Sequence, residues 1–153
     1  RIEASEWIYK NIPKGKTIAG EHWDDPLPLP LFGQSYHDFI IQLSVYDPES
    51  YSKINILADN LSASDYLVLS SRRVYQSILN NKKLYPKTSI FYKKLFSEEL
   101  GFLKVKEFTN YPFIFSDDLA DESFQSYDHP PVLIFKNIKH YDKKILIELF
   151  NDE

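Results

Sequence analysis

The sequence has 153 residues, 22 acidic and 18 basic side chains, a formal net charge of −4 and no cysteine. With 43% hydrophobic residues it can bury a core, so disorder, collagen and a coiled coil are excluded as descriptions of the whole chain. Disulfides, thiolate zinc sites and cysteine nucleophiles are excluded too. The acidic balance argues against a nucleic-acid partner, because binding a polyanion requires a surplus of lysine and arginine.

Two other features of the composition bear on origin and function. The chain contains no methionine, even at position 1, and its first helical pattern already includes Arg1, so we expect a domain excised from a longer protein. Aromatic residues are dense, at 16% of the chain. Such rings usually build a core, and the alternative is a surface that meets sugars, lipid headgroups or another protein.

The first part of the chain predicts a helix, a strand and a long loop. Apolar residues recur at helical spacing from Ala4 to Ile12, and Pro13 ends the pattern. A short β-rich run at 17–20 follows. Residues 21–36 then form a loop, in which three prolines at alternate positions favour an extended path.

The middle of the chain predicts a strand, a helix and a central strand. The strand spans 39–46 and the helix runs to Leu61, with Asp47 as its N-cap and Pro48 at its first position. The nearly continuous apolar run at 65–70 is typical of a strand that is covered on both faces.

The remaining pattern completes an α/β domain. It predicts a long loop at 109–130, strands at 102–108 and 132–135, and helices at 71–80, 86–100 and 142–150. Helices alternating with buried strands predict a single domain over residues 1–153, a layered, Rossmann-like mixed sheet of about five strands with helices on both faces. Because a loop and no helix joins the last two strands, these can pair antiparallel.

The most conspicuous polar cluster is Glu21, His22, Trp23, Asp24 and Asp25. It follows the first strand, where open α/β sheets usually place their ligands. Three carboxylates, an imidazole and an indole can bind a divalent cation, act as acid and base, or stack on a sugar ring. The structural alternative is that these carboxylates are solvated or cap turns, and no known motif has this spacing.

A second candidate group, Ser70, Ser71, Arg72 and Arg73, follows the central strand and opens the next helix. Backbone amides at a helix start, together with two arginines, can hold a phosphate or a carboxylate. The structural alternative is that a serine caps the helix. The glycines of a phosphate-binding loop and of a serine-nucleophile elbow are absent.

Asp128 and His129 precede the last strand. Neighbouring residues rarely orient one another for acid–base catalysis, and an aspartate before a proline-rich turn is ordinary turn chemistry. We group both residues with Glu21–Asp25 and Ser70–Arg72 as candidate substrate-binding residues. No residue is assigned a catalytic or metal-binding role.

Four stretches of the chain carry a resemblance to a known family. They are Ala4-Ser5-Glu6-Trp7-Ile8 with Asn11-Ile12-Pro13-Lys14-Gly15, Glu21-His22-Trp23-Asp24-Asp25 with Leu27-Pro28, Asp65-Tyr66-Leu67-Val68-Leu69-Ser70-Ser71-Arg72, and Tyr127-Asp128-His129-Pro130 with Val132-Leu133-Ile134-Phe135. In this order they resemble the C-terminal extracytoplasmic domain of bacterial polytopic membrane glycosyltransferases, the family 39-like, protein-mannosyltransferase-like enzymes. Large uncharacterised membrane proteins with similar soluble tails are an alternative kinship.

The resemblance implies a location, a partner and a role. The domain lies on the extracytoplasmic side of a bacterial cell membrane and contacts the transmembrane part of the same parent chain. The sugar donor of such enzymes is linked to polyprenyl phosphate, and their catalytic carboxylate lies in an early loop between membrane helices. We therefore expect a non-catalytic domain without a cofactor that helps to position the acceptor or the lipid-linked sugar, while any divalent metal belongs to the parent enzyme.

Two alternatives of other classes stay open. The acidic cluster allows a free-standing metal-dependent enzyme built on Glu21, Asp24, Asp25 and His129. The aromatic density allows a module that binds carbohydrate or protein.

Overall fold

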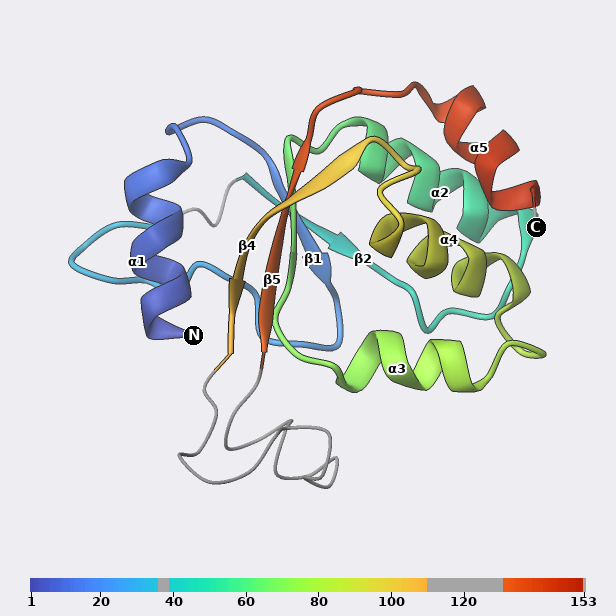
Figure 1. Ribbon diagram of the computed structural model, residues 1–153, viewed down its shortest axis with the longest axis horizontal. Coiled ribbons are helices and arrows are strands. Elements are labelled where there is room, and N and C mark those ends of the chain that lie inside the picture. Colours follow the sequence, from blue (N-terminus) through green and yellow to red (C-terminus); the bar gives the residue numbers. More distant parts are fainter. Residues whose placement is uncertain (36–38, 110–130, 153) are drawn as a thin grey trace.

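The computed structural model describes residues 1–35, 39–109 and 131–152. Within these ranges it has five helices and five strands (Figure 1). They are α1 (Ile2–Asn11), β1 (Ile18–Glu21), β2 (Ile40–Leu43), α2 (Tyr51–Ser62), β3 (Tyr66–Leu69), α3 (Arg73–Asn80), α4 (Pro86–Phe96), β4 (Phe102–Phe108), β5 (Val132–Asn137) and α5 (Lys143–Asn151). No helix in the described ranges has the length and apolar character needed to span a membrane.

The five strands form one mixed sheet in the order β2-β1-β3-β5-β4. The first three strands are parallel, with Ala19 of β1 opposite Ile41 of β2 and Leu67 of β3. β5 runs antiparallel to both β3 and β4. The sequence-based prediction of an α/β domain with a five-strand mixed sheet and an antiparallel final pair is therefore confirmed.

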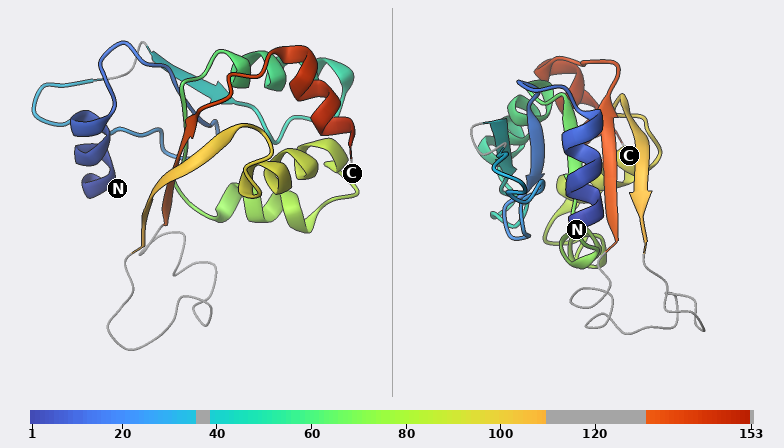
Figure 2. Two further views of the ribbon diagram at one scale, coloured as in Figure 1. Left: turned by 45° about the horizontal axis from the view of Figure 1, so that its top comes forward. Right: turned by 90° about the vertical axis from the view of Figure 1, so that its left-hand side faces the viewer.

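Helices cover both faces of the sheet, as the sequence predicts (Figures 1 and 2). α1 packs on one face, where Tyr66 and Val68 of β3 contribute to its core cluster. α2, α3, α4 and α5 pack on the other face, against Leu67 and Leu69. Side chains of a strand alternate between faces, so β3 is buried on both sides and is the central strand that its apolar run predicts.

Large aromatic rings fill the core on the four-helix face. The most deeply buried of them are Phe91, Tyr92, Phe102, Phe135 and Phe150. In the described part of the chain these rings are used in packing, as the structural interpretation of the composition expects.

Several boundaries differ from the sequence-based prediction. β2 ends at Leu43 rather than at residue 46, and α3 begins at Arg73 rather than at residue 71. Two further helix boundaries differ for a clear physical reason. α2 is capped by Ser50, whose hydroxyl accepts a hydrogen bond from the backbone N–H of Lys53 at 3.1 Å, so Asp47 is not the N-cap. α4 ends at Phe96, because Glu98 and Gly101 adopt positive φ angles of 63° and 78° and break the helical path.

The connections create a switch point at one edge of the sheet. The chain leaves β1 toward β2, whereas it leaves β3 in the opposite direction, through α3 and α4 to β4. The carboxyl ends of β1 and β3 are therefore the position at which such sheets usually place ligands. We call this edge the carboxyl edge. β4 also ends there, because it runs in the same direction as β3.

The proline-rich loop after β1 packs beside α1. Leu27 joins the core cluster on the α1 face. The hydroxyl of Ser5 accepts the backbone N–H of Leu29 at 3.0 Å, and the phenol of Tyr9 donates to the carbonyl of Leu29 at 2.8 Å. These contacts hold the start of the loop against the body of the domain.

We expect Gly101→Ala to destabilise the chain more than Gly33→Ala. Both glycines have positive φ, but only at Gly101 would an added Cβ collide with the side chain of Lys139. Strain alone costs roughly 1 kcal/mol, and the collision adds on the order of 1–3 kcal/mol to the loss in free energy of unfolding. Urea-induced unfolding measures both values, and equal losses would contradict the packing at Gly101.

Candidate functional site

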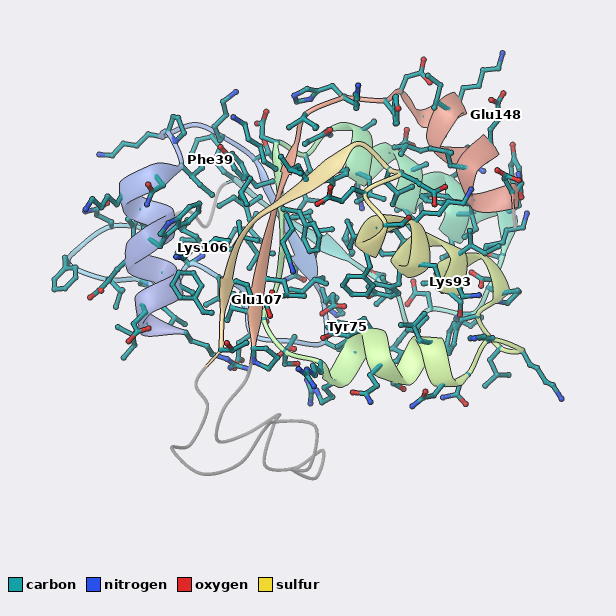
Figure 3. All side chains as sticks on the ribbon, in the orientation of Figure 1. Phe39, Tyr75, Lys93, Lys106, Glu107 and Glu148 are labelled. Atoms are coloured by element: carbon teal, nitrogen blue, oxygen red, sulfur yellow. The ribbon has the colours of Figure 1, made fainter. Side chains whose placement is uncertain are left out.

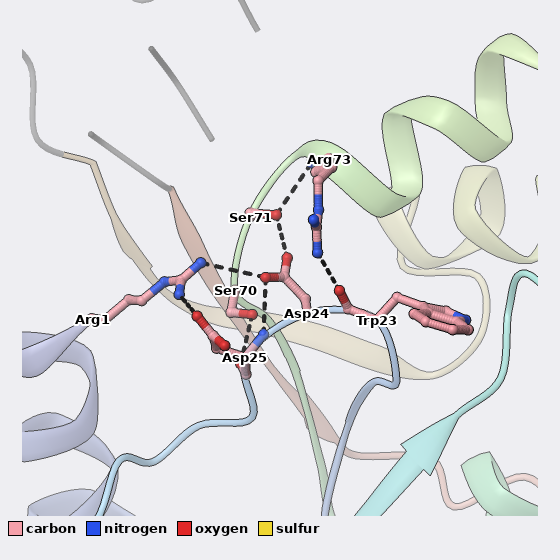
Figure 4. A network of polar contacts seen from close by, with 7 residues as sticks. All are labelled: Arg1, Trp23, Asp24, Asp25, Ser70, Ser71 and Arg73. Carbon is pink, nitrogen blue, oxygen red and sulfur yellow. Dashed lines mark hydrogen bonds and ion pairs between the residues drawn. The ribbon is translucent and has the colours of Figure 1, made fainter. Parts of the chain in front are cut away.

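The two polar groups predicted from the sequence meet at the carboxyl edge. Glu21 is the last residue of β1, and the backbone N–H of Asp24 donates to its carbonyl at 3.3 Å, closing a turn over residues 21–24. Ser70 and Ser71 follow β3. Because β1 and β3 are neighbours, the turn and the serines lie side by side (Figure 4).

Asp24 is the centre of the contacts between these groups. One carboxylate oxygen accepts a hydrogen bond from the hydroxyl of Ser71. The other accepts the backbone N–H of Asp25 at 2.9 Å and the guanidinium of Arg1 at 3.3 Å. The side chain is only 5% exposed. Both oxygens of this carboxylate are thus committed to holding the chain in place.

Further hydrogen bonds tie the two loops together. The hydroxyl of Ser70 donates to the carbonyl of Asp25 at 2.9 Å. The guanidinium of Arg73 donates to the carbonyl of Trp23, and that of Arg1 pairs with the carboxylate of Asp25 (Figure 4). We call these seven residues the edge network: Arg1, Trp23, Asp24, Asp25, Ser70, Ser71 and Arg73.

Ser71 contacts the start of α3, but neither serine occupies its N-cap position. The hydroxyl of Ser71 accepts the backbone N–H of Arg73 at 3.2 Å, while Arg72 occupies the N-cap position without a side-chain cap. Since the guanidinium of Arg73 already binds the carbonyl of Trp23, this turn is occupied by internal contacts rather than shaped around an anion.

Glu21 is buried, and its side chain does not join the edge network. Its side chain reaches α4, where Oε1 accepts a hydrogen bond from the phenol of Tyr92, while Oε2 is buried without a partner. Burial raises the pKa of Glu21 to about 8, helped by the negative charge of Asp24 and opposed by the Tyr92 hydrogen bond and by Arg73. The carboxyl group is therefore mainly neutral at neutral pH.

A second phenol lies near this acid. Tyr75 of α3 lies on the side of that helix that faces the sheet (Figure 3), and burial raises its pKa to about 12, with further contributions from the charges of Glu21 and Glu107. The rings of Tyr75 and Tyr92 are 6.1 Å apart. The surroundings of Glu21 on the four-helix face are thus aromatic.

The exposed part of the turn is formed by His22 and Trp23. Their rings meet edge to face at 5.1 Å, and Nδ1 of His22 lies 2.6 Å from the side-chain oxygen of Gln42. Trp23 is 57% exposed. Its indole points away from Asp24 and Asp25, toward the side of the sheet that carries α3 and α4 (Figure 4).

The acidic cluster does not form a metal site in the described part of the chain. No group of three or more potential metal ligands comes together within those ranges. Asp24 and Asp25 bind Arg1, and Glu21 binds Tyr92 instead of joining them. Asp128 and His129 lie outside the described residues. The substrate-binding role of the candidate residues stays a prediction.

Sequence reasoning did not identify Arg1 and Tyr92 as members of this region. In the sequence, Arg1 is only part of a helical pattern, and Tyr92 lies among the apolar positions of α4. Tyr92 is 71 positions from Glu21, and no local signal connects them.

Comparison with known proteins finds no matching family model, no significantly similar curated protein and no significantly similar solved structure. The chemistry of the carboxyl edge is therefore interpreted from its own residues. It offers an exposed indole, a buried neutral acid and a set of charged groups that are already paired.

We expect Asp24→Ala to lower the free energy of unfolding by roughly 1–3 kcal/mol, because it removes a buried acceptor from Ser71 and Arg1. Asp25→Ala should change it by less than about 0.5 kcal/mol, since the Asp25 side chain is 67% exposed. Chemical denaturation of both variants measures the difference. A larger loss in free energy of unfolding for Asp25→Ala would contradict the assignment of Asp24 as the centre of the edge network.

We also expect Glu21→Gln to change the pH dependence of stability. Between the ordinary pKa of 4.5 and the folded-state pKa of about 8, the folded chain keeps a proton that the unfolded chain has lost. Glu21 therefore makes the free energy of unfolding fall as the pH rises through this window, by at most about 5 kcal/mol. Glutamine stays neutral and keeps the bond to Tyr92, so it removes this slope.

The matched control for this prediction is Glu6→Gln on the exposed face of α1. It should leave the pH profile of the wild type unchanged. The free energy of unfolding is measured by denaturation at both ends of the pH window. The account of Glu21 fails if this free energy changes with pH by the same amount in Glu21→Gln and in the wild type.

Proposed function

We propose that this chain is a non-catalytic extracytoplasmic domain of a bacterial membrane glycosyltransferase that uses a polyprenyl-phosphate-linked sugar, and that its carboxyl edge helps to position the donor or the acceptor. One observation carries the proposal. Two of the stretches that resemble this family, which contain Asp24 and Ser71, are joined by the edge network, and Arg1 connects them to the start of α1. Segments far apart in the sequence thus meet at the carboxyl edge.

The contacts of the carboxylates favour a positioning role over catalysis. A nucleophile or general base must have an oxygen directed at the reacting atom. Asp24 instead directs its oxygens at Ser71, Arg1 and the backbone, and Glu21 is bonded to Tyr92. A free-standing metal-dependent enzyme built on this turn is less well supported, because the aspartates already have a cationic partner.

The exposed indole of Trp23 provides the contact surface that the proposal requires. In membranes containing the full natural gene product, we expect Trp23→Ala to reduce transfer from polyprenyl-phosphate-linked hexose donors by about 10-fold while the protein still folds. Phe32→Ala is the matched control, because Phe32 is 85% exposed but lies in the loop beside α1, outside the edge network.

The proposal has two clear points of failure. The natural reading frame should encode many hydrophobic spans ahead of Arg1, and a start codon near Arg1 would contradict it. Unchanged sugar transfer by the Trp23→Ala enzyme would show that the carboxyl edge has no role in the reaction.

A further inference from the structure

Basic side chains are concentrated in one part of this acidic chain. Residues 66–97, which cover β3, α3 and α4, contain seven of the 18 basic side chains and no acidic one, although the whole chain has a net charge of −4. The seven are Arg72, Arg73, Lys82, Lys83, Lys87, Lys93 and Lys94. Charge that is segregated in this way creates a local positive potential, which attracts anions whatever the sign of the total charge.

A cavity of about 590 Å³ lies within this basic region. We call it the α4 cavity, because the residues of α4 that line it recur every three or four positions from Pro86 onward and so share one face of the helix. Lys82, after α3, and Asp152, after α5, complete the lining on the side of the domain away from α1 (Figures 1 and 2). A volume of this size is typical of small-molecule sites.

Two lysines of the α4 cavity carry charge that no described residue compensates. Three lysines and two carboxylates line the cavity. Both carboxylates pair with Lys94, whose Nζ lies 3.2 Å from Asp152 and 3.9 Å from Glu99. Neither Lys82 nor Lys93 has a side-chain partner within the part of the chain that the structure describes. Two cationic groups are therefore available to a ligand.

The free donors of the α4 cavity select the class of ligand. The hydroxyl of Ser89 donates to a backbone carbonyl of α3 at 3.2 Å, and that of Ser97 donates to the carboxylate of Glu99 at 2.8 Å, so both are occupied. The two free ammonium groups donate hydrogen bonds and cannot accept them, so the ligand must supply acceptors. A single carboxylate would balance only one of the two charges. A phosphate group carries about −1.5 to −2 charge at neutral pH and has three acceptor oxygens.

We propose that the α4 cavity binds a ligand that carries a phosphate group, and that the ammonium groups of Lys82 and Lys93 pair with this phosphate. The cavity is large enough for an organic part of the ligand beside the phosphate, and Pro86 and Ile90 give that part an apolar wall. Lys94 stays paired with the two carboxylates and reduces their repulsion of the ligand. The inference is independent of the proposed function, because the α4 cavity contains no residue of the carboxyl edge.

The test is an NMR titration of the 153-residue chain with inorganic phosphate and with glycerol 3-phosphate, and separately with sodium chloride at matched ionic strength. At least one phosphate should shift the backbone amide signals of α4 saturably in the millimolar range, whereas chloride should not. Lys82→Ala combined with Lys93→Ala should weaken this binding by about 10-fold, because it removes both pairing cations. Lys93→Arg keeps the charge and should bind to within about 3-fold of the wild type.

Lys10→Ala combined with Lys14→Ala is the matched control. Both lysines are exposed, they lie on or just after α1, and their removal changes the net charge by the same amount. This variant should bind the phosphate as tightly as the wild type. Circular dichroism checks that each variant keeps its fold.

A second arm of the experiment identifies the source of the phosphate. The wild type and the double variant of the α4 cavity are sedimented with vesicles of anionic phosphatidylglycerol and of zwitterionic phosphatidylcholine. Binding to the anionic vesicles that needs both lysines, without saturable shifts from soluble phosphate, assigns the cavity to a lipid headgroup. Saturable shifts without vesicle binding assign it to a soluble phosphate ester.

Three results would overturn the inference. One is that neither the soluble phosphates nor the anionic vesicles bind. Another is that the double variant of Lys82 and Lys93 binds as well as the wild type. The third is that the control variant of Lys10 and Lys14 loses as much affinity, which would show that only the net charge matters.

Discussion

The burial of one acid at the end of β1 is the constraint on which the carboxyl edge depends. Glu21 lies at the boundary between the core and the exposed turn, and it is accommodated by staying protonated and by bonding to Tyr92 of α4. An ionised carboxylate is disfavoured at this position, because the cost of burial outweighs the stabilising charge of Arg73. The neutral acid therefore links the last residue of β1 to α4 and fixes where the following turn begins.

From this starting point the acidic cluster divides into groups with different roles. Asp24 is buried in hydrogen bonds that join the turn to α1 and to the start of α3. Asp25 is exposed and contributes an ion pair at the surface. His22 and Trp23 are the rings that this arrangement leaves exposed. A run of residues that suggests one site in the sequence thus divides into paired aspartates, two exposed rings and one buried acid.

The sequence predicted the architecture better than the site. The apolar run of β3 reveals a central strand because burial on both faces leaves a continuous signal. The position of the Glu21 turn beside Ser70 follows from the order of strands, which the alternation of elements constrains only partly. The pairing of Glu21 with Tyr92 is invisible in the sequence, because it depends on how α4 packs over the sheet. The N-cap of α2 was misassigned because Asp47 and Ser50 are both good capping residues, and tertiary packing selects between them.

The most direct measurement is a carbon-13 NMR titration of the Glu21 side-chain carboxyl in the folded chain. The account requires this carbon to titrate with a midpoint of about 8, as a buried acid bonded to Tyr92. A midpoint near the ordinary value of 4.5 would show that Glu21 is ionised and solvated at neutral pH. In that case the anchoring of the turn by a buried, neutral Glu21 would not stand.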